Sequence, residues 1–153
     1  MFSIGQMGSV VLDAHNVSGV MWVFQVSGNL TTGADASVIL KNGALASNVY
    51  WIVGGSASIG YATSMAGTIL AQSSISIDAY ARVDGRSLSL STVLFASASS
   101  AKVPNGVSAV VYPSVAVELY LGYCVHFAVL AVTTVQFGSS LLTVIESGSV
   151  YLL

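Results

Sequence analysis

The strongest constraint on the fold is a short repeat in the middle of the chain. The segment SASIGYATSMAG, residues 56–67, returns in looser form as SISIDAYARVDG, residues 74–85. A unit this short cannot bury its own apolar side chains, so it must stack on neighbouring copies. The repeat therefore predicts a solenoid. Residues 18 positions apart are alike in the pairs Ser58/Ser76, Ile59/Ile77, Met65/Val83, Gly67/Gly85, Leu70/Leu88 and Ala71/Ser89.

Weaker copies of the unit extend the repeat in both directions. Downstream, Phe95 stands one period after Ile77. Upstream, Leu30 and Val38 can take the parts of Ile59 and Met65, with two extra residues between them. The sequence thus predicts about four stacked copies of the unit.

Short strands dominate the local patterns, and no segment before residue 100 has an apolar period of 3.6 residues. The strand segments are rich in β-branched and aromatic residues and end at Gly, Asn, Asp or Ser. The sequence predicts an all-β, parallel β-helix with coils of about 18 residues; an antiparallel β-sandwich is the alternative. The expected strand segments are 9–13, 20–26, 37–40, 48–53, 68–71, 74–77 and 87–95.

Two of these segments alternate serine with an apolar residue. Ser74 and Ser76 alternate with Ile75 and Ile77, and the serines at 87, 89 and 91 alternate with leucines at 88 and 90. Because successive side chains of a strand point to opposite faces, we expect one buried face and one face toward water.

The composition argues against several classes of function. Only 7% of the residues are charged and the net charge is −2, which gives no electrostatic reason to bind nucleic acid. The single cysteine, Cys124, excludes an intrachain disulfide. With two histidines, His15 and His126, far apart in the chain, we expect no metal site, no cofactor, no small-molecule substrate and no enzymatic activity. The start of the chain lacks the basic and apolar regions of a signal peptide.

Residues 20–95 resemble the C-terminal half of the DUF3494 family of ice-binding proteins. The matching stretches are VMWVFQVSGNLTTGADASVILKNGALASNVYWIVG (20–54), SASIGYATSMAGTILAQSSISI (56–77) and VDGRSLSLS (83–91). The resemblance implies a right-handed, roughly triangular β-helix. In the family a long helix from the N-terminal half packs along one side, and this sequence has no counterpart of that helix. It therefore resembles a truncated member.

The resemblance also implies a site. The family places much of its ice-binding face at the motif Thr, then Ala or Gly, then any residue, then Thr or Asn. In this sequence the motif falls on residues 61–64, on residues 79–82 and on residues 32–35, with Ser37 as the better stacking partner of Ser64 and Arg82. The large side chains at 61, 80 and 82 depart from the motif and imply reduced activity. The implied face comprises Thr32, Ser37, Tyr61, Thr63, Ser64, Ala79, Ala81 and Arg82.

The last third of the chain lies beyond the resemblance. We expect a partial ice-binding-like β-helix over 1–100 and an apolar tail over 101–153. The segment 115–135 is interrupted only by Glu118 and His126, but its longest clean piece, from Leu119 to Val135, is borderline in length for a membrane span. Since basic flanking residues are missing, a β-rich or poorly ordered tail is favoured over membrane contact.

The function implied is adsorption to an ice crystal surface by a flat face, in a secreted or cell-surface setting. A structural or adhesive β-solenoid module of the cell surface is the alternative.

Overall fold

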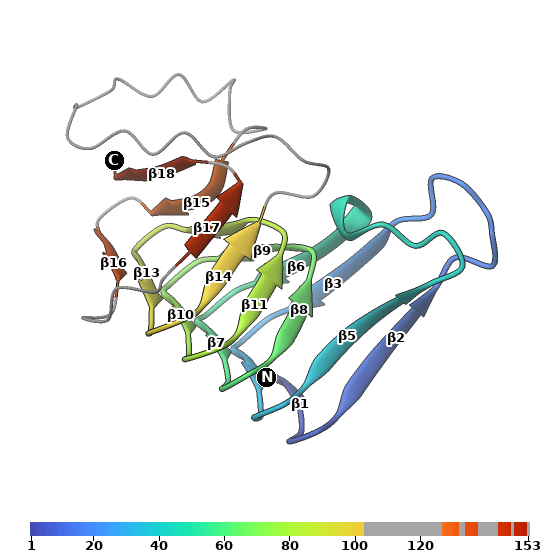
Figure 1. The fold of residues 1–153 in the computed structure, drawn as a ribbon, viewed down its shortest axis with the longest axis horizontal. Coiled ribbons are helices and arrows are strands. Elements are labelled where there is room, and N and C mark those ends of the chain that lie inside the picture. The colour runs from blue at the N-terminus through green and yellow to red at the C-terminus, as the bar shows by residue number, and fades with distance from the viewer. Residues whose placement is uncertain (103–126, 132–133, 138–143, 148, 153) are drawn as a thin grey trace.

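The chain is wound into three parallel β-sheets, each of six strands (Figure 1). The computed structural model describes residues 1–102 and, beyond them, the backbone of 127–131, 134–137, 144–147 and 149–152. Sheet A contains β1 (Phe2–Ile4), β4 (Leu30–Thr32), β7 (Ala57–Ile59), β10 (Ile75–Ile77), β13 (Thr92–Phe95) and β16 (Thr134–Phe137). Sheet B contains β2 (Ser9–Asp13), β5 (Ser37–Lys41), β8 (Ser64–Ala66), β11 (Arg82–Asp84), β14 (Ser100–Lys102) and β17 (Val144–Ser147). Sheet C contains β3 (Trp22–Val26), β6 (Val49–Val53), β9 (Thr68–Ala71), β12 (Ser87–Ser89), β15 (Phe127–Ala131) and β18 (Ser149–Leu152).

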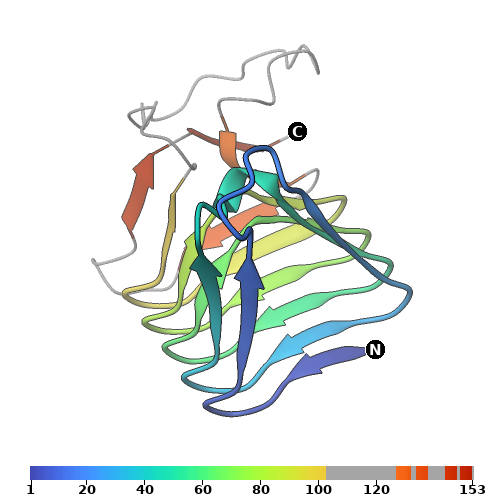
Figure 2. The ribbon, with the colours of Figure 1, turned by 90° about the vertical axis from the view of Figure 1, so that its right-hand side faces the viewer.

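Each coil passes through sheets A, B and C in that order before the next coil begins. Figure 2 shows the three sheets as the sides of a triangle, and the chain runs clockwise from β1 to β3 while it recedes from the viewer. A clockwise path that recedes is right-handed. The predicted right-handed parallel β-helix is confirmed.

The register of the middle coils confirms the repeat that the sequence predicted. Ser76 pairs with Ser58, Val83 with Met65 and Leu88 with Leu70. The predicted downstream copy of the unit is also confirmed, because Phe95 pairs with Ile77.

The upstream alignment was right for Val38, which follows Ser37 as Met65 follows Ser64, but wrong for Leu30. Leu30 lies beside Ala57, so Thr32 rather than Leu30 occupies the level of Ile59. The coil that contains Leu30 and the coil that contains Ala57 use the same number of residues to pass from sheet A to sheet B. Ser37 lies beside Ser64 just as Leu30 lies beside Ala57. No extra residues lie in that part of the coil.

The first two coils are longer than the predicted unit. Their extra residues lie between the start of the sheet B strand and the start of the sheet C strand, mostly in the corner loop and partly in the longer strands on either side of it. Phe2 lies beside Leu30 and Leu30 beside Ala57, so the first coil spans residues 2–29 and the second spans residues 30–56. The added loops are residues 14–21 and 42–48, and they project from one end of the molecule in Figure 1. In the next coil Gly67 alone separates β8 from β9. We call the first two coils wide and the coils beginning at Ala57 and Ile75 narrow.

The interior of the wide coils is filled by aromatic rings, whereas that of the narrow coils is aliphatic. Trp51 is fully buried and stacks on Phe24 with ring centroids 4.1 Å apart, and its indole Nε1–H donates to the carbonyl of Ala66 at 2.9 Å. Between narrow coils Ile77 stacks directly on Ile59. Larger rings fill the greater cross-section that the longer coils enclose, which keeps the interior close-packed.

The alternating serines face outward in the segment 74–77, whereas Ser87 and Ser89 face inward in the segment 87–91. Ile75 and Ile77 are buried, with Ser76 outside, as the alternation predicts. At 87–90 the face is reversed: Ser87 and Ser89 are buried and Leu90 is 64% exposed. The register explains this, because Ser87 lies beside buried Ile69 and Ser89 beside buried Ala71.

The described residues contain no α-helix; their one helical element is the 3-10 turn η1 (Ala46–Asn48). In this part of the chain no helix is long and apolar enough to cross a membrane. Strands β15 to β18 pair in parallel with the sheets of the preceding coils. Most of the apolar segment 115–135, including Cys124 and His126, lies outside the described residues, and the domain division at residue 100 stays a prediction.

Candidate functional site

The sequence-predicted site residues lie along the corner between sheets A and B and on the first outward row of sheet B. The row runs across five coils in continuous register and contains Ser9, Ser37, Ser64, Arg82 and Ser100. Adjacent strands of a sheet are about 4.8 Å apart. The predicted stacking of Ser37, Ser64 and Arg82 is thus confirmed.

The corner between sheets A and B has the same backbone conformation in five coils. Its central residue adopts a left-handed conformation each time, at Met7, Asp35, Ala62, Tyr80 and Ala98, with φ between 51° and 59°. Backbone hydrogen bonds connect successive corners, as from Ala62 N–H to the carbonyl of Ala79 at 3.0 Å. The corner is a rigid edge along the solenoid, and it holds the side chains of Tyr61 and Ala79 at equivalent positions.

Three of the predicted site residues point inward, which corrects the expectation for them. Thr32, Thr63 and Ala81 are 7%, 1% and 0% exposed. The Thr32 hydroxyl accepts from Gly60 N–H at 2.8 Å and lies 3.1 Å from the Thr63 hydroxyl, which donates to the carbonyl of Gly33 at 3.0 Å. These threonines support the corner from inside and cannot contact a flat external surface.

The remaining corner side chains are large. Tyr61 and Tyr80 are 48% and 58% exposed, and their rings meet edge to face with centroids 5.5 Å apart. Arg82 is exposed in the middle of the serine row. The structure thus brings these bulky groups together at the third and fourth coils.

The first coils of sheet B present a flat array of a different kind. Strands β2 and β5 have two outward positions free of charge, so Val11 and Ile39, 49% and 38% exposed, form a second row beside Ser9 and Ser37. We call Ser9, Val11, Ser37, Ile39 and Ser64 the uncharged patch. It presents hydroxyl and methyl groups in two directions of a regular grid.

Sheet A carries a second row that sequence reasoning did not assign to a face. Ser3, Thr31, Ser58 and Ser76 stack in register on its outer side. The hydroxyl of Ser76 donates to that of Ser58 at 3.3 Å. The strands β1 to β13 of this sheet contain no charged residue. The Ser-x-Ser-Ile repeat at 56–59 and 74–77 indicates the part of this row that Ser58 and Ser76 form. That Ser3 and Thr31 belong to the same row follows only from the strand register in the structure.

The carboxylate of Asp13, at the edge of the uncharged patch, is held by residues of the two wide loops. Both carboxylate oxygens of Asp13 accept from the Asn42 side chain, at 2.8 and 2.9 Å, and Oδ1 also accepts from the backbone N–H of His15 at 2.7 Å. The His15 backbone bond, followed by the Asn42 bonds, holds the pKa of Asp13 below its usual value. Among the described residues no group of three His, Cys, Asp or Glu side chains could hold a metal ion.

With this geometry established, the chain can be compared with known proteins. Residues 2–100 match the family described as ice-binding-like. The chain belongs to the ice-binding-like family. It is 37% identical over 82 residues to ice-binding protein 1 of Shewanella frigidimarina (strain NCIMB 400), covering 53% of this chain and 9% of that protein. It is 33% identical over 73 residues to an ice-binding protein of Flavobacterium frigoris (strain PS1), covering 48% of this chain and 26% of that one.

The fold is similar to that of a solved member of the same group. The crystal structure of an ice-binding protein from the Antarctic ascomycete Antarctomyces psychrotrophicus superposes with a TM-score of 0.57 at 24% identity. The similarity covers 97% of this chain and 59% of that one. The ice-binding-like chain therefore spans only part of the length of each of these relatives.

Proposed function

We propose that this chain adsorbs to ice through the uncharged patch of sheet B. Ice presents a lattice of ordered water without charge or pocket, so a binder needs a rigid face with regularly spaced small groups. The observation that carries the proposal is the two-row grid of Ser9, Ser37 and Ser64 beside Val11 and Ile39. The names of the relatives, all ice-binding proteins, support the same function.

The sheet A row is the less suitable face because β1, β4, β7 and β10 have three residues each. Each of these strands has a single residue between two inward ones, so the row extends in one direction only. The five-residue strands β2 and β5 provide two outward rows. Regular spacing in two directions is what a lattice plane requires.

Arg82 interrupts the same serine row two coils beyond Ser37. A guanidinium keeps its own hydration and stands above the level of the serines, so it limits the adsorbing area to the first three coils. Tyr61 and Ala79, on the neighbouring corner, form the border of the face. We expect an Arg82→Ser variant to bind ice more strongly than the natural chain.

The matched substitutions Ile39→Lys and Leu94→Lys test the face. These side chains are 38% and 37% exposed, one in sheet B and one in sheet A. We expect Ile39→Lys to abolish thermal hysteresis and inhibition of ice recrystallisation, because it places a hydrated charge in the patch, and Leu94→Lys to retain both. The opposite result would assign binding to sheet A. Absence of hysteresis and of ice-crystal shaping by the natural chain at high concentration would reject ice binding.

Adsorption of this kind is a physical contact and involves no chemical reaction. It implies an extracellular or cell-surface location, where the growing ice crystal is accessible. Proteinase accessibility on intact cells of the source organism would test the location.

A further inference from the structure

The basic residues of this chain are concentrated on one face. The whole sequence contains four Lys and Arg. Lys41, Arg82 and Lys102 lie on strands of sheet B, and Arg86 follows β11 at the next corner. Two of these, Arg82 and Lys102, line one hollow in the last described coils of the sheet. This concentration has no role in contact with an uncharged ice lattice.

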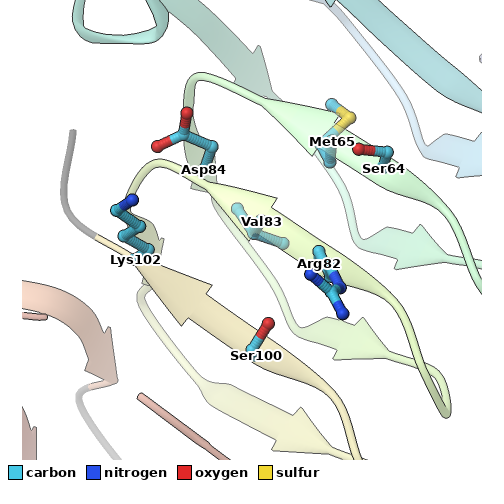
Figure 3. A pocket seen from close by; sticks show the side chains of 7 residues that line it. All are labelled: Ser64, Met65, Arg82, Val83, Asp84, Ser100 and Lys102. Atoms are coloured by element: carbon cyan, nitrogen blue, oxygen red, sulfur yellow. The ribbon is translucent and has the colours of Figure 1, made fainter. Parts of the chain in front are cut away.

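The hollow has a volume of about 170 Å³ and crosses β8, β11 and β14 (Figure 3). At one end the side chain of Arg82 lies between the hydroxyls of Ser64 and Ser100, its register partners on either side. At the other end Asp84 and Lys102 are register partners. Between the two ends the hollow is lined by Met65 and Val83, whose side chains are buried in the core.

The polar groups of the hollow are not engaged with one another. Among residues 1–102 the one ion pair within 4.0 Å joins His15 to Asp13. Over the same residues, no side-chain hydrogen bond involves Arg82, Asp84 or Lys102. Two cations and one carboxylate are therefore available to a ligand, together with the hydroxyls of Ser64 and Ser100.

The combination of groups defines the ligand chemistry. Arginine and lysine only donate hydrogen bonds, an ionised aspartate only accepts them, and serine does both. A simple anion would use Arg82 and Lys102 but would be repelled by Asp84. A neutral sugar would leave the guanidinium without an anionic partner. A ligand with a carboxylate next to free hydroxyls satisfies all of these groups, because a guanidinium binds carboxylate in a bidentate manner.

We propose that this hollow binds a uronic-acid unit of an acidic polysaccharide. The carboxylate of the sugar pairs with Arg82 at one end of the hollow, and its hydroxyls accept from Lys102 and donate to Asp84 at the other end. The volume suits a single sugar unit, since pockets for drug-sized ligands are about 300–1,000 Å³. The exposed rings of Tyr61 and Tyr80 lie at the corner that leads into β8 and β11, where the next sugar ring of the chain can pack.

Calorimetric titration of the full chain with a galacturonate trimer tests the proposal. We expect binding that weakens with added salt, and no binding of the neutral galactose trimer. Arg82→Gln and Lys102→Gln are each expected to lower the affinity about tenfold or more, because each removes a charge-assisted hydrogen bond. Lys41→Gln, which removes a lysine of the same sheet outside the hollow, is the matched control and should leave the affinity unchanged.

The Asp84→Asn variant separates a sugar from a simple anion. If the carboxylate accepts from a sugar hydroxyl, the variant binds the galacturonate trimer more weakly. If only the anionic group is bound, the variant binds more tightly and inorganic sulfate competes, which would overturn the proposal. Binding of a sulfated galactose oligomer in place of galacturonate, or no binding at millimolar trimer, would also overturn it. Circular dichroism of each variant confirms that the fold is retained.

Discussion

The wide and narrow coils of this solenoid share the same step from sheet A to sheet B and differ between sheet B and sheet C, in the corner loop and in the length of the strands beside it. The step from the start of the sheet A strand to the start of the sheet B strand is equally long in both kinds of coil, as from Phe2 to Ser9 and from Ile75 to Arg82. The corner between sheets B and C, in contrast, varies from a single glycine to the loop 14–21. The corner between sheets A and B is thus the constant element, and length can vary where loops project from the stack.

The same comparison applies to the outer face. In the wide coils sheet B presents an uncharged grid of serine, valine and isoleucine, with Asp13 and Lys41 beyond it at the strand ends, whereas in the narrow coils Arg82 and Asp84 occupy the rows of the grid itself. Most interior positions are apolar in both kinds of coil. The fold therefore constrains the inward residues and the corners, and the outward rows are free to acquire different binding properties along one solenoid.

The largest expected effect tests the aromatic filling of the wide coils. Trp51→Ala removes a fully buried indole that stacks on Phe24 and donates to Ala66, so we expect a loss of about 3–5 kcal/mol in the free energy of unfolding. Leu90→Ala, at a 64% exposed position, is the control and should cost less than about 0.5 kcal/mol. Urea unfolding measures both. A cost for Trp51→Ala near that of the control would mean that the wide coils do not depend on aromatic packing.

A second test concerns the tight corner of the narrow coils. A Cβ at Gly85 would collide with the backbone carbonyl of Gly67 in the coil below, so Gly85→Ala should destabilise by about 1–3 kcal/mol. Gly5→Ala, at the corner between sheets A and B of the first coil, is the comparison variant, because no atom lies within 4 Å of the added carbon there. We expect it to be neutral or slightly stabilising in thermal unfolding. Equal effects of the two variants would contradict the idea that narrow coils are limited by this contact.

The serines inside the narrow coils provide a smaller test. The buried hydroxyl of Ser87 has no hydrogen-bond partner, whereas that of Ser89 donates to the carbonyl of Ser73 and accepts from Ser91 N–H. We expect Ser87→Ala to raise the free energy of unfolding by about 1 kcal/mol and Ser89→Ala to lower it by about 1 kcal/mol. Chemical denaturation of the two variants measures both changes in the free energy of unfolding. Changes of the same sign would contradict the assignment of hydrogen bonds.

The smallest expected effect is the pH dependence of the wide loops. The pKa of Asp13 is lowered in the folded chain, so the carboxylate stabilises the fold above its unfolded pKa of about 3.9. This contribution is lost as the pH falls through the folded pKa. We expect the thermal unfolding temperature of Asp13→Asn to depend less on pH below 4 than that of the natural chain. Identical profiles for the two chains would show that the Asn42 and His15 contacts do not affect stability.

The sequence by itself determined the solenoid and most of its interior. The spacing of the repeat placed Ile77 on Ile59 and Val83 on Met65, because equivalent residues of stacked coils must have the same size and polarity to share one core. The stacking of Ser37, Ser64 and Arg82 followed from the same spacing.

Only the tertiary structure decided the direction of the side chains at corners and the place of the extra residues. Thr32 points inward because it follows the alternation of β4, whose Leu30 is also buried, whereas Thr63 points inward directly after the left-handed corner residue Ala62. Ser87 is buried because its register partner is Ile69, which lies in another coil. The hollow around Arg82 likewise combines residues from three coils, and only the register of these coils brings them together.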